Sequence, residues 1–345
     1  MTKKAFGVLI GRFSGFHNGH LALILEALEH VNKLIVVVGS SNSSRNIKNP
    51  FTFVERKKMI IMALLEREEY GHLAQRVTVV EARDFLYDEI AWLNEVRVQV
   101  AKITGNSTDV TLFGHDKDAS SYYLRNFEEW KPHLQGLKAG GISATDIRIA
   151  FYMGEDISSF DVPFYVKSFL QEFRESPEGQ KLTEEYHYIK EYRKQQEVYP
   201  FPIIFVTVDA VVVKSAHVLV VERGQTPGKG LYALPGGFIG EHESVYESTV
   251  RELREETSLS LISSILDGYY RKTEVFDHPM RSERGRTITH ASLFVLPSGH
   301  LNPVKGGDDA ARAFWIPLSD VYAYPERFYE DHAHIIHKMT TGGII

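Results

Sequence analysis

Residues 237–259 read GFIGEHESVYESTVRELREETSL, and this stretch determines the fold expected for the second half of the chain. Glu252, Glu255 and Glu256 are spaced i, i+3, i+4, so on an α-helix they share one face within a single turn. Three neighbouring carboxylates repel one another and do not stabilise a helix by themselves. Because hard divalent cations prefer oxygen ligands, the spacing predicts a metal-binding helix. The alternative interpretation is a solvated acidic helix face.

The same stretch resembles the Nudix box, G-x5-E-x7-R-E-U-x-E-E-x-G-U with U aliphatic, of hydrolases that cleave nucleoside diphosphates linked to another moiety. Every fixed position matches except the last glycine, which is Ser258 here. That glycine ends the helix, and serine can replace it at the cost of some strain if the backbone there is left-handed. The resemblance implies a Nudix α/β/α sandwich with a mixed sheet. It also implies Mg²⁺ or Mn²⁺ bound by Glu252, Glu255 and Glu256 with help from Glu243, and a catalytic part for Glu255 and Glu256. The general base is either Glu256 or an acid from a later loop.

Composition restricts the classes of function. The chain has 345 residues, enough for two domains, and a net charge of −6 without a marked Lys/Arg cluster, so we expect no nucleic-acid partner. Without any cysteine, disulfides, zinc–thiolate sites and cysteine nucleophiles are excluded. The N-terminal apolar run is too short for a signal peptide, and no run approaches the ~18 residues of a membrane span. We therefore expect a cytoplasmic protein without membrane association, and a homo-oligomer is compatible with the sequence.

The first half alternates short apolar runs with amphipathic segments. This βαβαβαβ order predicts a doubly wound, Rossmann-like α/β domain with a parallel sheet, whose ligands bind at the carboxyl ends of the strands. The expected strands are residues 5–10, 34–38, 77–80 and 110–113, and the expected helices are residues 21–31, 54–66 and 89–103. We place the first domain at residues 1–185, a charged linker at 186–200 and the second domain at 201–345. In the second domain the expected strands are 203–213, 218–222, 289–296 and 313–316.

Directly after the first expected strand, residues 11–20 read GRFSGFHNGH and lead into a helix. A glycine-flanked turn that opens a helix presents backbone N–H groups to phosphate. His17 and His20 lie three apart in the first turn and can point to one anion. Metal binding by the pair and simple helix capping are the alternatives.

This stretch resembles the G-R-F-x-P-x-H-x-G-H signature of nucleotidylyltransferases, in the form of the archaeal-type nicotinamide mononucleotide (NMN) adenylyltransferases. Residues 142–148, ISATDIR, look like the second signature of that family, I-S-x-T-x-x-R. Gly15 departs from the pattern, which usually has proline there. The resemblance implies that His17 and His20 contact the ATP phosphates during catalysis, and that Mg²⁺ accompanies a triphosphate bound by Gly11, Arg12, Ser143, Thr145 and Arg148.

The remaining contacts of the first domain rest on weaker patterns. Asp84 follows the third strand, where it could bind the nicotinamide nucleotide, and Trp92 is either a stacking platform or a core residue. Gly114 and Asp116 end the fourth strand, where Asp116 is a candidate for a ribose contact or a cap. Arg56, after the expected cap Thr52, is a candidate for a phosphate contact.

In the second domain, the loop 277–287 contains Arg281, Arg284 and Arg286. Arginine forks bind phosphate bidentately, so we interpret this loop as a substrate clamp, with a merely solvated loop as the alternative. The later turn at residues 306–310 carries two aspartates and is either the source of a base or a plain turn.

Together the two halves resemble bifunctional NMN adenylyltransferases fused to a Nudix ADP-ribose pyrophosphatase. The resemblance implies one domain that makes NAD from ATP and NMN, and another that hydrolyses ADP-ribose to AMP and ribose 5-phosphate. A nucleotidylyltransferase for another phosphate, a non-catalytic ADP-ribose-sensing Nudix domain, and a Nudix domain acting on NAD(H) or other nucleoside diphosphates are the alternatives.

Overall fold

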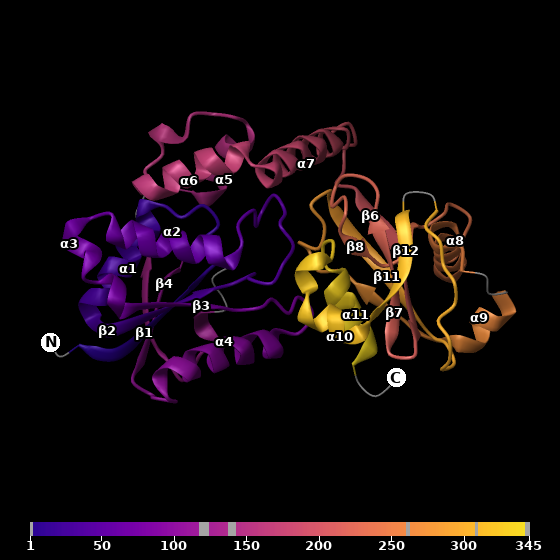
Figure 1. Cartoon of the computed structure of the whole chain (residues 1–345), viewed down its shortest axis with the longest axis horizontal. Coiled ribbons are helices and arrows are strands. Elements are labelled where there is room, and N and C mark those ends of the chain that lie inside the picture. Colours follow the sequence, from indigo (N-terminus) through magenta and orange to yellow (C-terminus); the bar gives the residue numbers. More distant parts are fainter. Residues whose placement is uncertain (1–2, 117–123, 137–142, 260–262, 308–309, 342–345) are drawn as a thin grey trace. The chain divides into compact units, whose positions relative to one another are not determined.

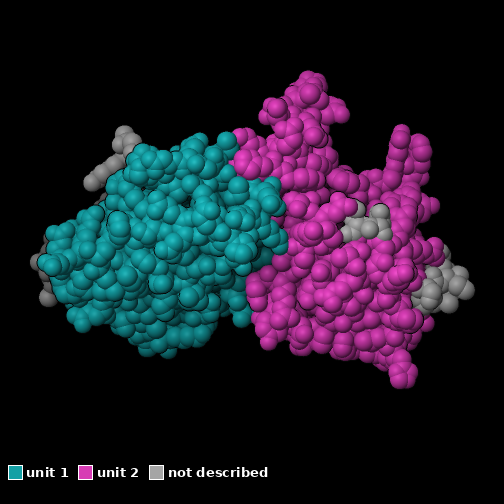
Figure 2. All heavy atoms as spheres, turned by 45° about the horizontal axis from the view of Figure 1, so that its top comes forward, with its two compact units in different colours: residues 1–184 teal, residues 185–345 magenta. Residues whose placement is uncertain are grey.

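The computed structural model describes residues 3–116, 124–136, 143–259, 263–307 and 310–341. The chain divides into two compact units, Met1–Glu184 (unit 1) and Glu185–Ile345 (unit 2), which Figure 2 colours separately. Within the described residues, none of the helices combines the length and the apolar character that a membrane span requires.

Unit 1 is built on a parallel sheet of five strands in the order β3-β2-β1-β4-β5, which confirms the doubly wound fold (Figure 1). The strands are β1 (Lys4–Gly11), β2 (Val31–Val38), β3 (Val77–Glu81), β4 (Val110–Asp116) and β5 (Lys131–Gly136). The sequence analysis missed β5 because its residues, KPHLQG, form no apolar run. Such a composition is tolerated at a sheet edge, where half of the backbone groups face away from the sheet.

Helices cover both faces of this sheet because alternate strand residues are buried on each side. The helices are α1 (Asn18–His30), α2 (Phe53–Leu65), α3 (Glu68–Gly71), α4 (Glu89–Thr104), α5 (Ala144–Tyr152) and α6 (Phe164–Glu175). Val8 and Ile10 of β1 pack with Val96 of α4 in one hydrophobic cluster. On the opposite face, Phe113 of β4 lies against the last turn of α1. As predicted, Thr52 caps α2, in a capping box with Glu55.

Helix α7 (Pro177–Lys194) crosses the boundary between the units. α7 begins at Pro177, two residues after the end of α6 at Glu175. A side chain at Gly179 would place its Cβ 1.9 Å from the carbonyl oxygen of Phe173, so only glycine lets α7 start so close to the end of α6. Much of the predicted linker, residues 186–200, is therefore the second half of a helix.

Unit 2 contains a mixed sheet, as predicted, in the order β10-β11-β6-β7-β12, with β8 beside β7 and β9 beside β6. Only β11 and β6 pair in parallel among these strands. The strands are β6 (Ile204–Lys214), β7 (His217–Arg223), β8 (Tyr232–Ala233), β9 (Gly236–Phe238), β10 (Tyr270–Phe276), β11 (Arg286–Val295) and β12 (Ala310–Pro317). The helices are α8 (Val245–Thr257), α9 (Ser263–Tyr269), α10 (Leu318–Ala323) and α11 (His332–Thr340).

Helix α8 carries the acidic stretch quoted first. Its buried stripe, Tyr246, Val250 and Leu253, packs against the sheet, as the spacing predicts. Ser258 ends the helix in the left-handed conformation, with φ 49° and ψ 26°, and its N–H donates to the Arg254 carbonyl. The serine therefore occupies a glycine position, as expected.

Candidate active sites

In unit 1, the loop after β1 leaves the sheet at its carboxyl edge, between strands β2 and β4 that pair on either side of β1. Gly11 ends β1, and His17 is the N-cap of α1. The backbone N–H of His20 donates to His17 Nδ1 over 3.3 Å, and that of His17 donates to His20 Nδ1 over 3.4 Å. The two rings stack with their centroids 3.8 Å apart. The two histidines thus form a reciprocal capping box, in which the ring of each accepts from the backbone N–H of the other.

This mutual capping determines the tautomers. A backbone N–H is always a donor, so both Nδ1 atoms must be acceptors and a neutral ring carries its proton on Nε2. Gly19 permits the arrangement, because a Cβ there would lie 3.0 Å from Nδ1 and Cε1 of His17. Capping and anion binding, which the sequence presented as alternatives, are therefore compatible: Nδ1 is used for the first and Nε2–H is suited to the second.

The two sequence signatures of unit 1 meet in space. Arg148 of α5 donates from Nη1 to the Ser14 carbonyl over 2.7 Å and from Nη2 to Thr145 Oγ1 over 3.1 Å. Ser143 caps α5 by accepting from the Asp146 N–H. Gly15 has φ 96°, and a Cβ there would lie 3.1 Å from the Ala144 carbonyl oxygen. Proline, whose φ is held near −65°, cannot adopt this turn, whereas glycine can.

Arg56 has a different role from the predicted phosphate contact. Its guanidinium is buried, with 1% of the residue exposed, and donates to the carbonyls of Arg12, Gly39 and Ser40 over 2.7, 2.7 and 3.0 Å. Burial lowers its pKa to about 10. Arg56 thus joins the loops after β1 and β2, and the exposed Arg12 remains the better placed of the two arginines for a ligand.

The remaining candidate residues of unit 1, predicted for the nicotinamide nucleotide or for a ribose, follow β3 or lie at the end of β4. Asp84 accepts from the Ser40 N–H over 3.3 Å and so supports the loop after β2. Trp92 packs against the hydrophobic cluster of α4, which favours the core role over stacking on a ligand. Gly114 is buried within β4, and Asp116 ends that strand, but its side chain lies outside the described residues.

In unit 2, Arg251 holds the acidic face of α8 together. Its Nη1 donates to Glu252 Oε1 over 2.8 Å and to Glu255 Oε2 over 2.9 Å, and its Nε lies 2.9 Å from both oxygens of Glu243. Arg251 and Glu255, four residues apart on α8, thus form an i, i+4 ion pair. The hydroxyl of Ser248 and the guanidinium of Arg251 lower the pKa of Glu243. One guanidinium therefore offsets the repulsion among three carboxylates.

Glu252 and Glu256 face inward and approach the backbone of β9. A Cβ on Gly237 would lie 2.5 Å from Glu252 Oε1, and Glu256 Oε2 accepts from the Gly236 N–H over 3.0 Å. Each glutamate is 9% exposed. Burial raises the pKa of Glu256 to about 8, although the Gly236 N–H opposes this, and the nearby Glu252 and Asp209 raise it further. Glycine at 237 therefore leaves room for the Glu252 carboxylate, and glycine at 236 keeps clear of the Val208 carbonyl oxygen, which a Cβ would approach to 2.2 Å.

This donor set fits Mg²⁺ or Mn²⁺. The carboxylates of Asp209, Glu252 and Glu256 bring negative charge into a buried region, as the raised pKa of Glu256 indicates, and a divalent cation would offset it. Glu255 is different: 47% of its side chain is exposed, and it lines a separate hollow with Tyr246 and neighbouring polar residues. The sequence predicted three equivalent ligands, whereas the structure separates two inner carboxylates from an outer one.

A pocket beside Glu256 collects two of the three predicted clamp arginines. Arg284 lines it, and its buried Nε has no hydrogen-bond partner among the described residues. Arg281 also lines it, but donates from Nε and Nη2 to Asp331 over 2.9 Å each in a buried ion pair. Arg286 does not line the pocket and donates to the Asp277 carbonyl. Of these three arginines, Arg284 is thus the candidate for a ligand contact.

The C-terminal segment supplies pocket residues that the sequence analysis missed. Tyr329, Glu330 and His332 line the pocket, and Arg223 of β7 lies over the Tyr329 ring at 4.2 Å. His332 Nδ1 accepts from the Leu234 N–H over 2.9 Å, and burial lowers its pKa. The only available signal was a polar run, Glu330-Asp331-His332, without a motif. Of the predicted acidic turn, Asp308 and Asp309 lie outside the described residues.

Comparisons with known proteins match each unit separately. Residues 8–162 match the cytidylyltransferase-like family, and residues 204–339 match the NUDIX domain. A nicotinamide/nicotinic acid mononucleotide adenylyltransferase of Acinetobacter baylyi is 37% identical over 187 residues, which cover 54% of this chain and 95% of the relative. An ADP-ribose pyrophosphatase of Methanocaldococcus jannaschii is 35% identical over 144 residues, which cover 41% of this chain and 76% of the relative.

A solved structure matches both units together. It is a crystal structure of a bifunctional NMN adenylyltransferase/ADP-ribose pyrophosphatase from Francisella tularensis, complexed with AMP and a manganese ion. It is 37% identical in sequence, covers 97% of this chain and 98% of its own, and superposes with a TM-score of 0.90.

Proposed function

Because the chain belongs to the family of bifunctional NMN adenylyltransferase/ADP-ribose pyrophosphatases, we propose that its two activities are divided between its units. Unit 1 makes NAD from NMN and ATP, and unit 2 hydrolyses ADP-ribose to AMP and ribose 5-phosphate. The observation that carries this division is that the polar motif residues of each unit are joined within that unit by its own hydrogen bonds.

In unit 1, the 5′-phosphate of NMN attacks the α-phosphorus of ATP, a new P–O bond forms and pyrophosphate leaves. The Nε2–H groups of His17 and His20 donate to phosphate oxygens where negative charge develops, and the N-terminus of α1 adds its backbone donors. Arg12 and Arg148 bind the triphosphate from the two sides of the loop. No covalent nucleophile is needed, because positioning and charge stabilisation suffice for this transfer.

In unit 2, Glu252 and Glu256 would hold Mg²⁺ or Mn²⁺, with Glu255 on the outer side. When bound, the cation supplies a polarised diphosphate and a water of lowered pKa. Arg251 orients Glu252, and Arg284, which lines the pocket, donates from its guanidinium to an oxygen of the substrate. These roles follow from where the donors lie relative to the pocket.

For the general base, the pocket favours one acid from a later loop. Glu330 lines the pocket and has φ 45°, a left-handed backbone that is costly for a side chain of this size. The Tyr329 hydroxyl donates to Glu330 Oε1 over 2.8 Å. Strain of this kind is common at functional sites, so we assign Glu330 as the candidate base. Glu330→Gln should lower kcat for ADP-ribose much more than it changes KM.

The substrate preference is tested by measuring kcat/KM of unit 2 for ADP-ribose and for NAD, with Mg²⁺ and with Mn²⁺. Both compounds share the diphosphate, so selection must act at the terminal ribose, where NAD carries a cationic nicotinamide ring. Arg223 and Arg284 beside the pocket would repel that ring. We expect ADP-ribose to be preferred. Equal values, or a preference for NAD, would instead indicate a dinucleotide pyrophosphatase.

A further inference from the structure

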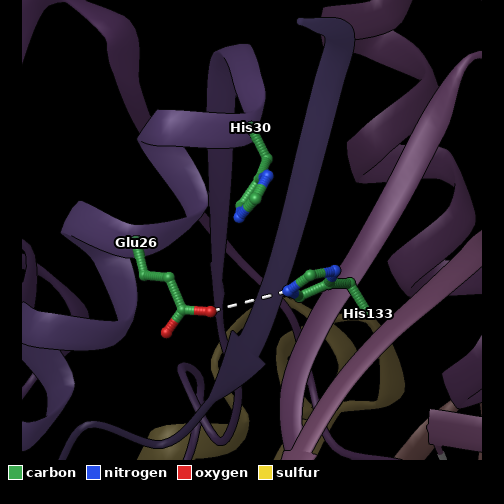
Figure 3. Close-up of side chains that lie close together, drawn as sticks. All are labelled: Glu26, His30 and His133. Carbon is green, nitrogen blue, oxygen red and sulfur yellow. Dashed lines mark ion pairs between the residues drawn. The ribbon is translucent and has the colours of Figure 1, made fainter. Parts of the chain in front are cut away.

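A cluster of metal-ligating side chains lies in unit 1, away from both sites described above. It consists of Glu26 and His30 from α1 and His133 from the edge strand β5 (Figure 3). One ligand atom from each residue lies within 4.8 Å of the other two. Among the described residues, no other group of three or more histidine, aspartate or glutamate side chains brings its ligand atoms this close together.

The fold brings these residues together for reasons visible in the backbone. Glu26 and His30 are four apart on α1, so they lie on one face of the helix. His133 pairs in register with Phe113 of the neighbouring strand, so its side chain is on the sheet face that α1 covers. The His30 and His133 rings are 4.8 Å apart between centroids, and both lie beside the Phe113 ring.

The distances suit a small divalent ion. Around a tetrahedral zinc, ligand atoms ~2.0–2.2 Å from the metal are separated from one another by ~3.3 Å. Glu26 Oε1 and His133 Nε2 are already 3.5 Å apart, close to this value. A single Glu–His ion pair needs no second imidazole beside it, and two protonated imidazoles would repel each other. A metal ion, in contrast, uses both rings in their neutral form.

We propose that Glu26, His30 and His133 form a binding site for a borderline divalent metal ion such as Zn²⁺ or Co²⁺. Two imidazole nitrogens and one carboxylate oxygen select such ions over Mg²⁺, which prefers oxygen ligands alone. Three protein ligands leave one position for water. The site is separate from the phosphate site, because His17 and His30 stand at opposite ends of α1, whose 13 residues span ~20 Å.

The position of the site indicates what a bound ion would do. β5 is an edge strand that pairs only with β4, so its other side has no neighbouring strand among the described residues. A metal ion that joins His133 to Glu26 and His30 ties this strand to α1. The ion would therefore stabilise unit 1 rather than take part in adenylyl transfer.

The test uses the full chain after its metals have been removed with a chelator. Co²⁺ is titrated alone and followed by its visible absorption, and Zn²⁺ is titrated alone by calorimetry. Glu256→Gln weakens the acidic site of unit 2, so we expect the Co²⁺ spectrum of the wild type to persist in this variant and to be displaced by one equivalent of Zn²⁺. A hundredfold excess of Zn²⁺ over its Kd should raise the Tm of unit 1 by ~5–10 °C.

His30→Ala and His133→Ala should each remove the Co²⁺ spectrum and the Zn²⁺-dependent rise in Tm. His30 is exposed, so its variant is expected to fold, and circular dichroism checks both variants. His72→Ala, at an exposed histidine outside the cluster, is the matched control and should behave as the wild type. Equal Zn²⁺ binding by His30→Ala and the wild type would overturn the proposal, as would loss of the Co²⁺ spectrum in Glu256→Gln alone.

Discussion

Arg284 and Arg281 lie in one short loop and line one pocket, yet the structure predicts opposite consequences for their loss. Arg284 has a buried Nε without a partner among the described residues, whereas Arg281 makes two hydrogen bonds to the buried Asp331. Replacing each arginine with methionine keeps most of the apolar stem and removes the guanidinium. Arg284→Met should therefore impair hydrolysis of ADP-ribose, and Arg281→Met should impair folding of unit 2.

The magnitudes follow from the partners. A hydrogen bond from a charged donor contributes ~1.5–3 kcal/mol, so losing the Arg284 contact should lower kcat/KM for ADP-ribose by ~10–150-fold. Removing an unpartnered donor should leave the free energy of unfolding unchanged or slightly higher. In Arg281→Met, Asp331, which is 0% exposed, loses both hydrogen bonds and the charge of this guanidinium, which should cost ~3–5 kcal/mol.

Two measurements separate these outcomes. AMP release from ADP-ribose with saturating Mg²⁺ gives kcat/KM. Urea unfolding of unit 2 is followed by the fluorescence of Trp315, in β12, with Trp92 and Trp130 of unit 1 replaced by phenylalanine in all the proteins compared. NAD synthesis by the same samples is the internal control and should not change in Arg284→Met. If Arg284→Met kept normal kcat/KM, or lost as much stability as Arg281→Met, the distinction drawn from the hydrogen bonds would be wrong.

Three further predictions concern the other motif residues. His20→Ala should lower kcat for NAD synthesis by ~10²–10³ with little change in the Kd for ATP, measured by rapid quench and calorimetry, and near-normal turnover would contradict the assigned Nε2–H donor. Burial raises the pKa of Glu256 to about 8, so the metal-free protein binds more protons when folded than when unfolded. Its free energy of unfolding relative to Glu256→Gln should therefore fall as the pH rises from 4.5 to about 8. Excess Mg²⁺ should remove this fall. A flat difference between the two proteins would refute it. Ser258→Gly should raise the free energy of unfolding of unit 2 by ~1 kcal/mol without changing hydrolysis, because Ser258 is exposed and left-handed at φ 49°. Chemical denaturation measures this gain, and an unchanged free energy of unfolding would contradict the prediction.

Residues close together in sequence could be placed well from the sequence alone. The spacing of Glu252, Glu255 and Glu256 predicted α8, and the i, i+4 spacing of Arg251 and Glu255 places them on one helix face, where they form an ion pair. The two signatures of unit 1 are each continuous in sequence, so their capping residues were also recognisable. In these cases the geometry of one helix determines the contact, and no tertiary information is needed.

Contacts across long sequence separations could not be predicted in this way. Arg281, Arg284 and Arg286 look alike in sequence, and their different roles depend on Asp331, fifty residues later, and on the direction of the loop. Arg56 likewise looks like a phosphate ligand in the sequence, but its guanidinium donates hydrogen bonds to the backbone carbonyls of two loops. Tertiary hydrogen bonds decide which arginine still has a donor for a ligand, and periodicity does not report them.

The two sites handle negative substrates in different ways, which explains how a chain of net charge −6 can bind them. In the proposed function, unit 1 uses the Nε2–H groups of His17 and His20 and the start of α1, beside the exposed Arg12. Unit 2 concentrates carboxylates, and Arg251 neutralises their outer side through hydrogen bonds to Glu243, Glu252 and Glu255. The inner side retains the buried charge that a divalent cation would offset. Because one guanidinium stabilises α8 before metal binds, Arg251 should be needed for the helix to fold as well as for the orientation of its ligands.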